Sequence, residues 1–107
     1  MSEEDRMFAM SNLLPKNTGL KYPIWFSARI ENQEPGIKID LEDDKSIYVT
    51  ILDKKVIGDV DSIPMEDLND IFRWIDLNKE LLLKYWYGAH EGIIDSGEVA
   101  EHIIFNR

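Results

Sequence analysis

The sequence predicts an α+β domain in which an antiparallel meander of three or four strands packs against one long helix. Two observations carry this prediction. Short runs of alternating apolar and polar residues occupy 24–57, separated by turn residues, and apolar residues at helical spacing follow from 65 to 87. Short connections favour antiparallel neighbours, and a sheet with one apolar face must bury that face against another element.

The chain of 107 residues is long enough for one hydrophobic core and too short for two. We therefore expect a single domain over 1–107. It divides into an N-terminal segment at 1–20, a sheet at 21–60, a long helix at 63–88 and a C-terminal segment at 89–107.

The strands are expected at 24–30, 37–41, 46–52 and 56–57, with turns at 31–36, 42–45 and 53–55. Their apolar residues alternate, which places one face of the sheet against the helix. The other face is then exposed and is a credible binding surface, and its side chains are Trp25, Ser27, Arg29, Lys38 and Tyr48.

The long helix is expected from Met65 to Tyr87, with Ser62 as its N-cap and Gly88 as its end. One apolar stripe forms its core face: Leu68, Ile71, Phe72, Ile75, Leu82, Leu83 and Trp86. A second stripe lies on nearly the opposite side: Trp74, Leu77, Leu81 and Tyr85.

Two apolar stripes mean that the helix is covered on both sides. The C-terminal segment could cover the second stripe, and Asn78 could tie that segment to the helix. Alternatively, another chain covers it, in a homodimer or with a different partner anchored by Trp74 and Tyr85. Within the C-terminal segment, Asp95 or Ser96 is expected to cap a short helix over 97–104, with a strand at 102–105 as the alternative.

The composition excludes several classes of protein. The chain contains no cysteine, which rules out disulfides, zinc–thiolate sites and a cysteine nucleophile. No apolar run reaches the ~20 residues that cross a bilayer, and we expect no signal peptide because residues 1–6 are acidic and polar. We expect a cytoplasmic protein that does not bind membranes.

The charge is strongly acidic, with 12 Lys and Arg against 21 Asp and Glu and a formal net charge of −9. This disfavours direct nucleic-acid binding, which depends on basic contacts to phosphates. The acids concentrate in two stretches, the first comprising Asp40, Glu42, Asp43 and Asp44, and the second lying within 59–70. They either form a solvated surface or meet a basic partner protein, for which DNA mimicry is one mechanism.

Motifs for catalysis, metals or cofactors are lacking. The two histidines, His90 and His102, lie outside metal-ligand motifs, the loop at 40–44 lacks the spacing of a calcium loop, and no glycine-rich phosphate loop occurs. We expect no cofactor and no metal. An enzyme, such as a small hydrolase or nuclease that uses His90 or His102, is the alternative.

Two segments resemble motifs of a group of small bacterial proteins of unknown function. Residues 17–27 resemble their opening pattern, TGL-x-x-x-[VI]-W-[IF]-S, and residues 72–88 resemble their helix pattern, W-I-x-L-N-x-x-x-L-x-x-Y-W-x-G. More distantly, the chain is similar to bacterial domains found in toxin–antitoxin-like pairs. The resemblance covers about residues 17–104 and implies no catalytic residues.

One departure from the group bears on function. Its members carry several basic residues between the first two strands, whereas residues 31–36 here are Glu-Asn-Gln-Glu-Pro-Gly. If members of the group bind nucleic acid through those bases, we do not expect this chain to do so. The acidity, the missing catalytic groups and the candidate exposed aromatic residues together predict a non-enzymatic, protein-binding module, and the resemblance implies that it is of toxin–antitoxin-like or mobile-element accessory type. Its candidate contact residues are Trp74, Leu77, Leu81, Tyr85, Asp40, Glu42, Asp43, Asp44, Trp25 and Arg29.

Overall fold

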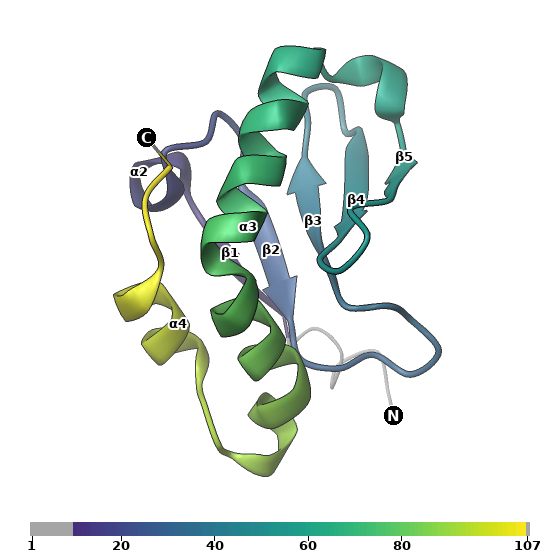
Figure 1. Cartoon of the computed structure of the whole chain (residues 1–107). Coiled ribbons are helices and arrows are strands. Elements are labelled where there is room, and N and C mark those ends of the chain that lie inside the picture. The colour runs from purple at the N-terminus through teal and green to yellow at the C-terminus, as the bar shows by residue number, and fades with distance from the viewer. Residues whose placement is uncertain (1–9, 107) are drawn as a thin grey trace.

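Five strands form one antiparallel sheet in the computed structural model, which describes residues 10–106 (Figure 1). Each strand pairs with its neighbours in sequence, in the order β1-β2-β3-β4-β5. Their bounds are β1 (Met10–Leu13), β2 (Ile24–Ser27), β3 (Gly36–Asp40), β4 (Ser46–Thr50) and β5 (Val56–Gly58). The predicted α+β meander is confirmed, with one strand more than expected.

That additional strand is β1, which begins before the expected start of the sheet at residue 21. Leu13 pairs with Ile24 of β2, and both side chains are buried in the core. The strand is followed at once by the short helix α2 (Pro15–Thr18), which ends at Gly19 in the left-handed conformation that glycine adopts readily (φ 80°).

One layer of helices covers one face of the sheet. In Figure 1, α3 (Met65–Gly88) runs across this face and α4 (Ser96–His102) lies beside it, while no helix of residues 10–106 covers the other face. Two short 3₁₀ turns flank α3, namely η1 (Val60–Ser62) and η2 (Ala89–Glu91). None of the helices within residues 10–106 has the combination of length and apolar character that spanning a membrane requires.

The N-cap of α3 is Pro64, so the prediction of Ser62 is wrong. Ser62 lies inside the η1 turn, where its N–H donates to the carbonyl of Asp59 at 3.0 Å. Pro64 is extended (φ −63°, ψ 146°), and its carbonyl accepts the first helical hydrogen bond from the N–H of Leu68. Proline suits this position because its fixed φ is compatible with the start of a helix.

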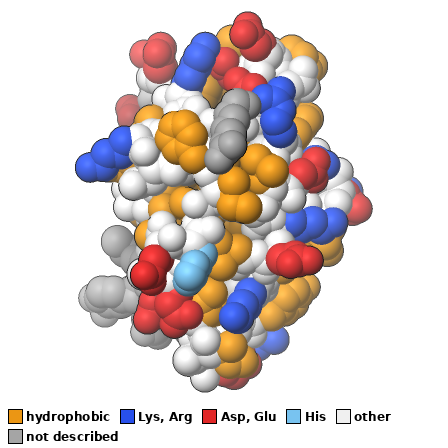
Figure 2. Space-filling model, turned by 60° about the vertical axis from the view of Figure 1, so that its left-hand side comes forward, with side chains coloured by type: hydrophobic (Ala, Val, Ile, Leu, Met, Phe, Trp, Pro, Cys, Tyr) orange, Lys and Arg blue, Asp and Glu red, His pale blue; other side chains and the backbone are white. Residues whose placement is uncertain are grey.

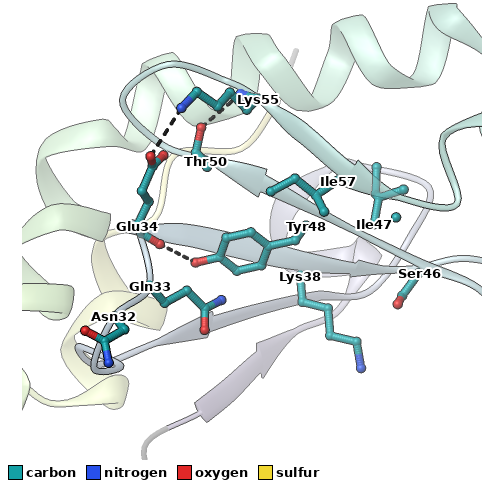
Figure 3. Close-up of a pocket in the computed structure, with 11 residues that line it drawn as sticks. Asn32, Gln33, Glu34, Lys38, Ser46, Ile47, Tyr48, Thr50, Lys55 and Ile57 are labelled. Carbon is teal, nitrogen blue, oxygen red and sulfur yellow. Dashed lines mark hydrogen bonds and ion pairs between the residues drawn. The ribbon is translucent and has the colours of Figure 1, made fainter.

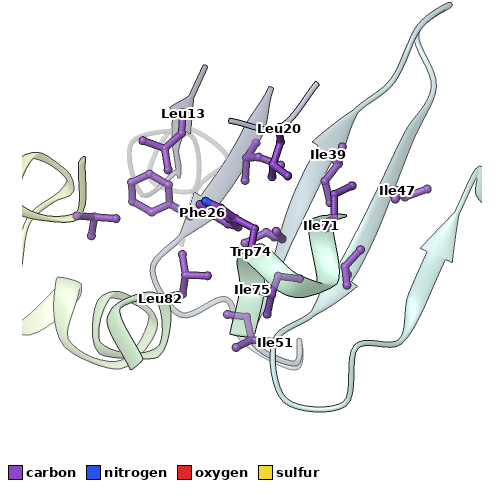
Figure 4. Close-up of a cluster of buried hydrophobic side chains, with 14 of the residues drawn as sticks. Leu13, Leu20, Phe26, Ile39, Ile47, Ile51, Ile71, Trp74, Ile75 and Leu82 are labelled. Carbon is purple, nitrogen blue, oxygen red and sulfur yellow. The ribbon is translucent and has the colours of Figure 1, made fainter. Parts of the chain in front are cut away.

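The core lies between the sheet and α3 (Figure 4). The sheet contributes alternating side chains, and the helix contributes a single broad face. Fully buried members include Ile24, Ile37, Ile39, Ile47 and Val49 from the strands and Ile71, Trp74 and Ile75 from α3.

The interpretation of two opposed helix stripes needs correction. Trp74 and Tyr85 are buried by the described chain itself, at 0% and 5% exposure, and lie at one side of the core face. The Tyr85 ring meets the ring of Phe26 edge-on, with centroids 4.9 Å apart. Leu77 is exposed and Leu81 is partly exposed. The apolar face of α3 is therefore wider than one core stripe, and no partner chain is needed to cover Trp74 or Tyr85.

The C-terminal segment packs beside α3, as the intramolecular alternative predicts. Asp95 caps α4 by accepting from the N–H of Glu98 at 2.8 Å, so the predicted short helix is confirmed, although it ends at His102 and not at residue 104. Residues 103–106 follow α4 without regular secondary structure, and Asn78 fixes them to α3. Its amide nitrogen donates to the carbonyl of Ile104 at 3.1 Å, and its oxygen accepts from the N–H of Ile104 at 2.7 Å.

Candidate protein-binding surface

The uncovered face of the sheet carries one continuous row of side chains across all five strands. We call it the open-face row, and the strand register aligns its members as Asn12, Trp25, Lys38, Tyr48 and Ile57. Four strand spacings separate its ends, which makes it about 19 Å long. Three of the five residues are aromatic or aliphatic and only one is charged, a composition typical of interface centres.

Two interactions fix the Trp25 end of this row. The indole N–H of Trp25 donates to a carboxylate oxygen of Asp40 at 2.6 Å. The other oxygen of Asp40 lies 3.6 Å from the ammonium of Lys38. The Trp25 ring is partly exposed, and the carboxylate holds it in one orientation. A ring fixed in this way loses little conformational entropy when a partner covers it.

Tyr48 lies at the centre of a shallow groove (Figure 3). Its hydroxyl donates to the carbonyl of Glu34 at 2.6 Å, and its ring lies against Gly36 of the neighbouring strand. A Cβ at Gly36 would lie 2.4 Å from the ring, so only glycine leaves room for this position. Burial raises the pKa of Tyr48 to about 12, which keeps the hydroxyl protonated as a donor.

The groove has a volume of about 580 Å³. Residues 32–34, between β2 and β3, line one side, and Lys55 and Ile57 line the other. Lys55 spans the groove by pairing with the carboxylate of Glu34 at 3.2 Å. Ile57 is 57% exposed on the edge strand, which makes it the most accessible apolar member of the open-face row.

An acidic end adjoins the open-face row. The strand register places Asp40 beside Ser46, and Ser46 exchanges hydrogen bonds with Asp59: its N–H donates to the carboxylate at 3.0 Å, and its carbonyl accepts from the Asp59 N–H at 3.1 Å. The two acidic stretches of the sequence therefore meet here. The acidic end comprises the acids that these contacts place together, namely Asp40, Glu42, Asp43, Asp44 and Asp59.

The contacts of Asp67 also connect the two stretches. The Tyr22 hydroxyl donates to its carboxylate at 2.8 Å, and the Lys21 ammonium lies 3.0 Å away. These two partners hold the pKa of Asp67 below its usual range. The pKa of Tyr22 is raised to about 12, mainly by burial and by Asp67, with a smaller contribution from Glu42. Asp67 is thus a structural carboxylate, whereas Glu42, Asp43 and Asp44 are exposed.

The structure brings together only part of the expected exposed face. Trp25, Lys38 and Tyr48 lie on it as predicted, but Ser27 is buried and its hydroxyl donates to the carbonyl of Ala28. Arg29 is not on this face, because β2 ends at Ser27. The N–H of Arg29 instead donates to the Trp86 carbonyl at the end of α3, at 2.8 Å.

The histidines lie in separate places. The Nε2 atom of His90 is 3.0 Å from the backbone carbonyl of Arg29, in a hollow between residues 29–35 and the end of α3. His102 ends α4 and lines a different hollow, beside Leu77 and Lys79. Within residues 10–106, no group of three His, Asp or Glu side chains is arranged to hold a metal ion.

Sequence reasoning missed two members of the open-face row, Asn12 and Ile57. The signal for Ile57 was present, because it precedes Gly58 in an expected strand and alternates with Val56. Asn12 carried no such signal, because its strand was not predicted. No family model, no curated protein and no solved structure matches the chain.

Proposed function

We propose that this chain is a non-enzymatic protein-binding module that uses the open face of its sheet. The observation that carries the proposal is the position of the open-face row directly beside the acidic end. The row supplies aromatic and aliphatic anchors, and the acidic end supplies charge at its border. Protein interfaces commonly combine an apolar centre with a polar rim.

This pattern favours a partner whose apolar surface is bordered by Lys and Arg. Exposed carboxylates at Glu42, Asp43 and Asp44 would attract such a partner and orient it over the row. A second copy of this chain is disfavoured. Lys38 occupies the middle of the row, so a two-fold axis there would bring it against its own copy, and each copy carries a net charge of −9.

The resemblance to small bacterial proteins supports one class of partner. Residues 17–27 include Trp25 of the open-face row, and the bacterial domains that the chain more distantly resembles occur in toxin–antitoxin-like pairs. We infer that the partner is another small protein of such a pair or of a mobile element. Because the chain lacks cysteine, we propose that the complex forms in the cytoplasm.

The test is a pull-down from the source cells, eluted across a salt gradient, with the wild type and two variants. Ile57→Asp places a charge at the exposed end of the row. Asp43→Asn with Asp44→Asn removes two charges from the acidic end and tolerates the left-handed backbone at both positions (φ 58° and 60°). Circular dichroism checks that each variant is folded.

The wild type should retain a basic protein that is released at moderate salt. Ile57→Asp should weaken its purified complex about tenfold or more. The double Asn variant should lower the salt needed for release, whereas Glu91→Gln with Glu101→Gln, an equal change of charge elsewhere, should leave it unaltered. A complex that forms equally well with the wild type, Ile57→Asp, the double Asn variant and the double Gln control would contradict the proposal.

DNA mimicry is the second candidate, and the convergence of the two acidic stretches favours it. A DNA mimic needs its carboxylates and not its aromatic anchors. Under that reading, the double Asn variant loses binding and Ile57→Asp keeps it. Loss of binding in both variants supports the protein-binding face instead.

A further inference from the structure

A second groove lies on the helical side of the molecule. We call it the α3 groove, and it is a hollow of about 510 Å³ between α3 and the segment that follows α4. Its apolar floor consists of Leu77, Leu81 and Ile104, and Lys79 and Lys84 lie along it. Figure 2 shows hydrophobic side chains gathered on the face that α3, α4 and the C-terminal segment share, with both basic and acidic side chains around them.

The floor of this groove is held in place despite its exposure. Leu77 is 44% exposed and Ile104 is 47% exposed. Ile104 is fixed because Asn78 bonds both its N–H and its carbonyl, and Asn78 is itself buried in the middle of α3. The exposed isoleucine is thus fixed to a long helix and presents a preformed apolar surface.

The charge around the groove is opposite in sign to that of the chain as a whole. Lys79 and Lys84 form no ion pair with any side chain of residues 10–106. Asp76 also lines the groove, but the ammonium of Lys54 lies 2.6 Å from its carboxylate and balances it. Glu80 is the remaining acid. The four charged side chains that line the groove cancel, and with Lys54 counted three lysines face two acids, a local charge of +1 on a chain with a net charge of −9.

We propose that the α3 groove binds an acidic amphipathic segment of another protein. Leucine-type side chains of that segment would cover Leu77 and Ile104, and its carboxylates would pair with Lys79 and Lys84. Helix-in-groove recognition uses this combination of apolar anchors with complementary charge. The proposal is independent of the open sheet face, because it rests on the other layer of the fold.

The probe is a synthetic helical peptide of about 16 residues with Leu on one face and Glu on the other. Two comparison peptides replace Glu by Lys or Leu by Ser. Each peptide is added to the ¹⁵N-labelled full-length chain at low salt, and amide shifts are followed by NMR. The acidic amphipathic peptide should shift the amides of Leu77, Lys79 and Ile104, and both comparison peptides should shift them much less.

Matched variants then test the lysines. Lys79→Glu with Lys84→Glu should weaken the acidic peptide about tenfold or more. Lys79→Gln with Lys84→Gln should have a smaller effect in the same direction. Lys16→Glu with Lys45→Glu makes the same change of charge at two other lysines that form no ion pair with a side chain of residues 10–106, and it should leave binding unaltered.

Three results would overturn the proposal. The amides of the groove do not shift with the acidic peptide, or they shift equally with the basic peptide, or binding survives the double Glu variant. Sedimentation of the chain without peptide tests whether a second copy of the chain occupies the groove instead. A dimer that dissociates in the Leu77→Ser variant would show that it does.

Discussion

Asn78 should determine whether the C-terminal segment stays on the molecule. The residue is 2% exposed, and its side chain makes two hydrogen bonds to Ile104 and a third to the Trp74 carbonyl at 3.0 Å. Replacing it with Ala removes both links to residues 103–106. It also leaves the N–H and the carbonyl of Ile104, both in a partly buried position, without those partners.

The expected loss of stability follows from these contacts. Each hydrogen bond contributes about 1 kcal/mol net, and an unsatisfied buried group costs about 1–3 kcal/mol. The higher helix propensity of Ala offsets about 0.5 kcal/mol of this. Asn78→Ala should therefore reduce the free energy of unfolding by about 2–4 kcal/mol, which lowers the Tm of a domain of this size by roughly 10–20 °C.

Urea denaturation of the purified chain measures this change. Asn69→Ala is the control, because Asn69 lies exposed on the same helix and the same substitution there removes no contact with Ile104. In native-state hydrogen exchange, the Ile104 amide should lose protection in Asn78→Ala and keep it in the control. If both variants are equally stable and Ile104 stays protected, the assigned role of Asn78 is wrong.

Three further predictions concern single contacts. Gly36→Ala should lower stability by about 1–3 kcal/mol in thermal melts, because the added Cβ would collide with the Tyr48 ring; an unchanged Tm would show that the ring moves away freely. Tyr22→Phe should destabilise the chain at pH 7, since it removes the main partner that depresses the pKa of Asp67. The stabilisation from ionised Asp67 exists above its unfolded pKa of about 4 and is lost as pH falls through the lower folded value. The difference in free energy of unfolding between the wild type and Tyr22→Phe, measured by urea denaturation, should therefore be smaller at pH 3 than at pH 7. A difference in free energy of unfolding that is larger at pH 3 than at pH 7 would refute this role of Tyr22. Asp95→Ala should cost about 1 kcal/mol in urea denaturation through loss of the cap on α4, and Asp95→Asn should recover most of it, since Asn also caps helices; equal loss in both would show that the cap is not the cause.

Local patterns predicted the central strands and α3 well. Residues 37–41 alternate strictly, and Ile47, Val49 and Ile51 alternate within 46–52. The helical spacing over 65–87 is long enough to distinguish a helix from a strand. β1 could not be found in this way, because Met10–Leu13 has four residues without alternation. Its strand character comes from pairing with β2, which is a tertiary effect.

The helical spacing in the sequence also did not predict how wide the buried face of α3 is. Trp74 and Tyr85 fall outside the narrow core stripe, so the sequence suggested a second, opposed surface. In the fold, α4 and the C-terminal segment extend the cover on that side of α3. The large side chains of Trp74 and Tyr85 reach the core from one side of the core face of α3. Asn78 lies between them and is buried because it forms hydrogen bonds with the segment at 103–106.

The candidate surface was predicted in part. Alternation placed Trp25, Lys38 and Tyr48 on one face, and their register then aligned them into a single row. Arg29 was misplaced because β2 ends at Ser27, three residues earlier than the pattern indicates. The meeting of the two acidic stretches depends on the contact between Ser46 and Asp59, and no local signal in the sequence encodes that contact.

The most direct test of the protein-binding face is to map the retained partner on the labelled chain by NMR. The indole N–H of Trp25 and the amides of Lys38, Tyr48 and Ile57 report the open-face row, and the amides of Val99 and Glu101 report α4. Binding of the partner should shift the signals of the open-face row, and raising the salt concentration should return them to their unbound positions. Shifts confined to α4, with the Trp25 indole signal unmoved at saturation, would contradict the account.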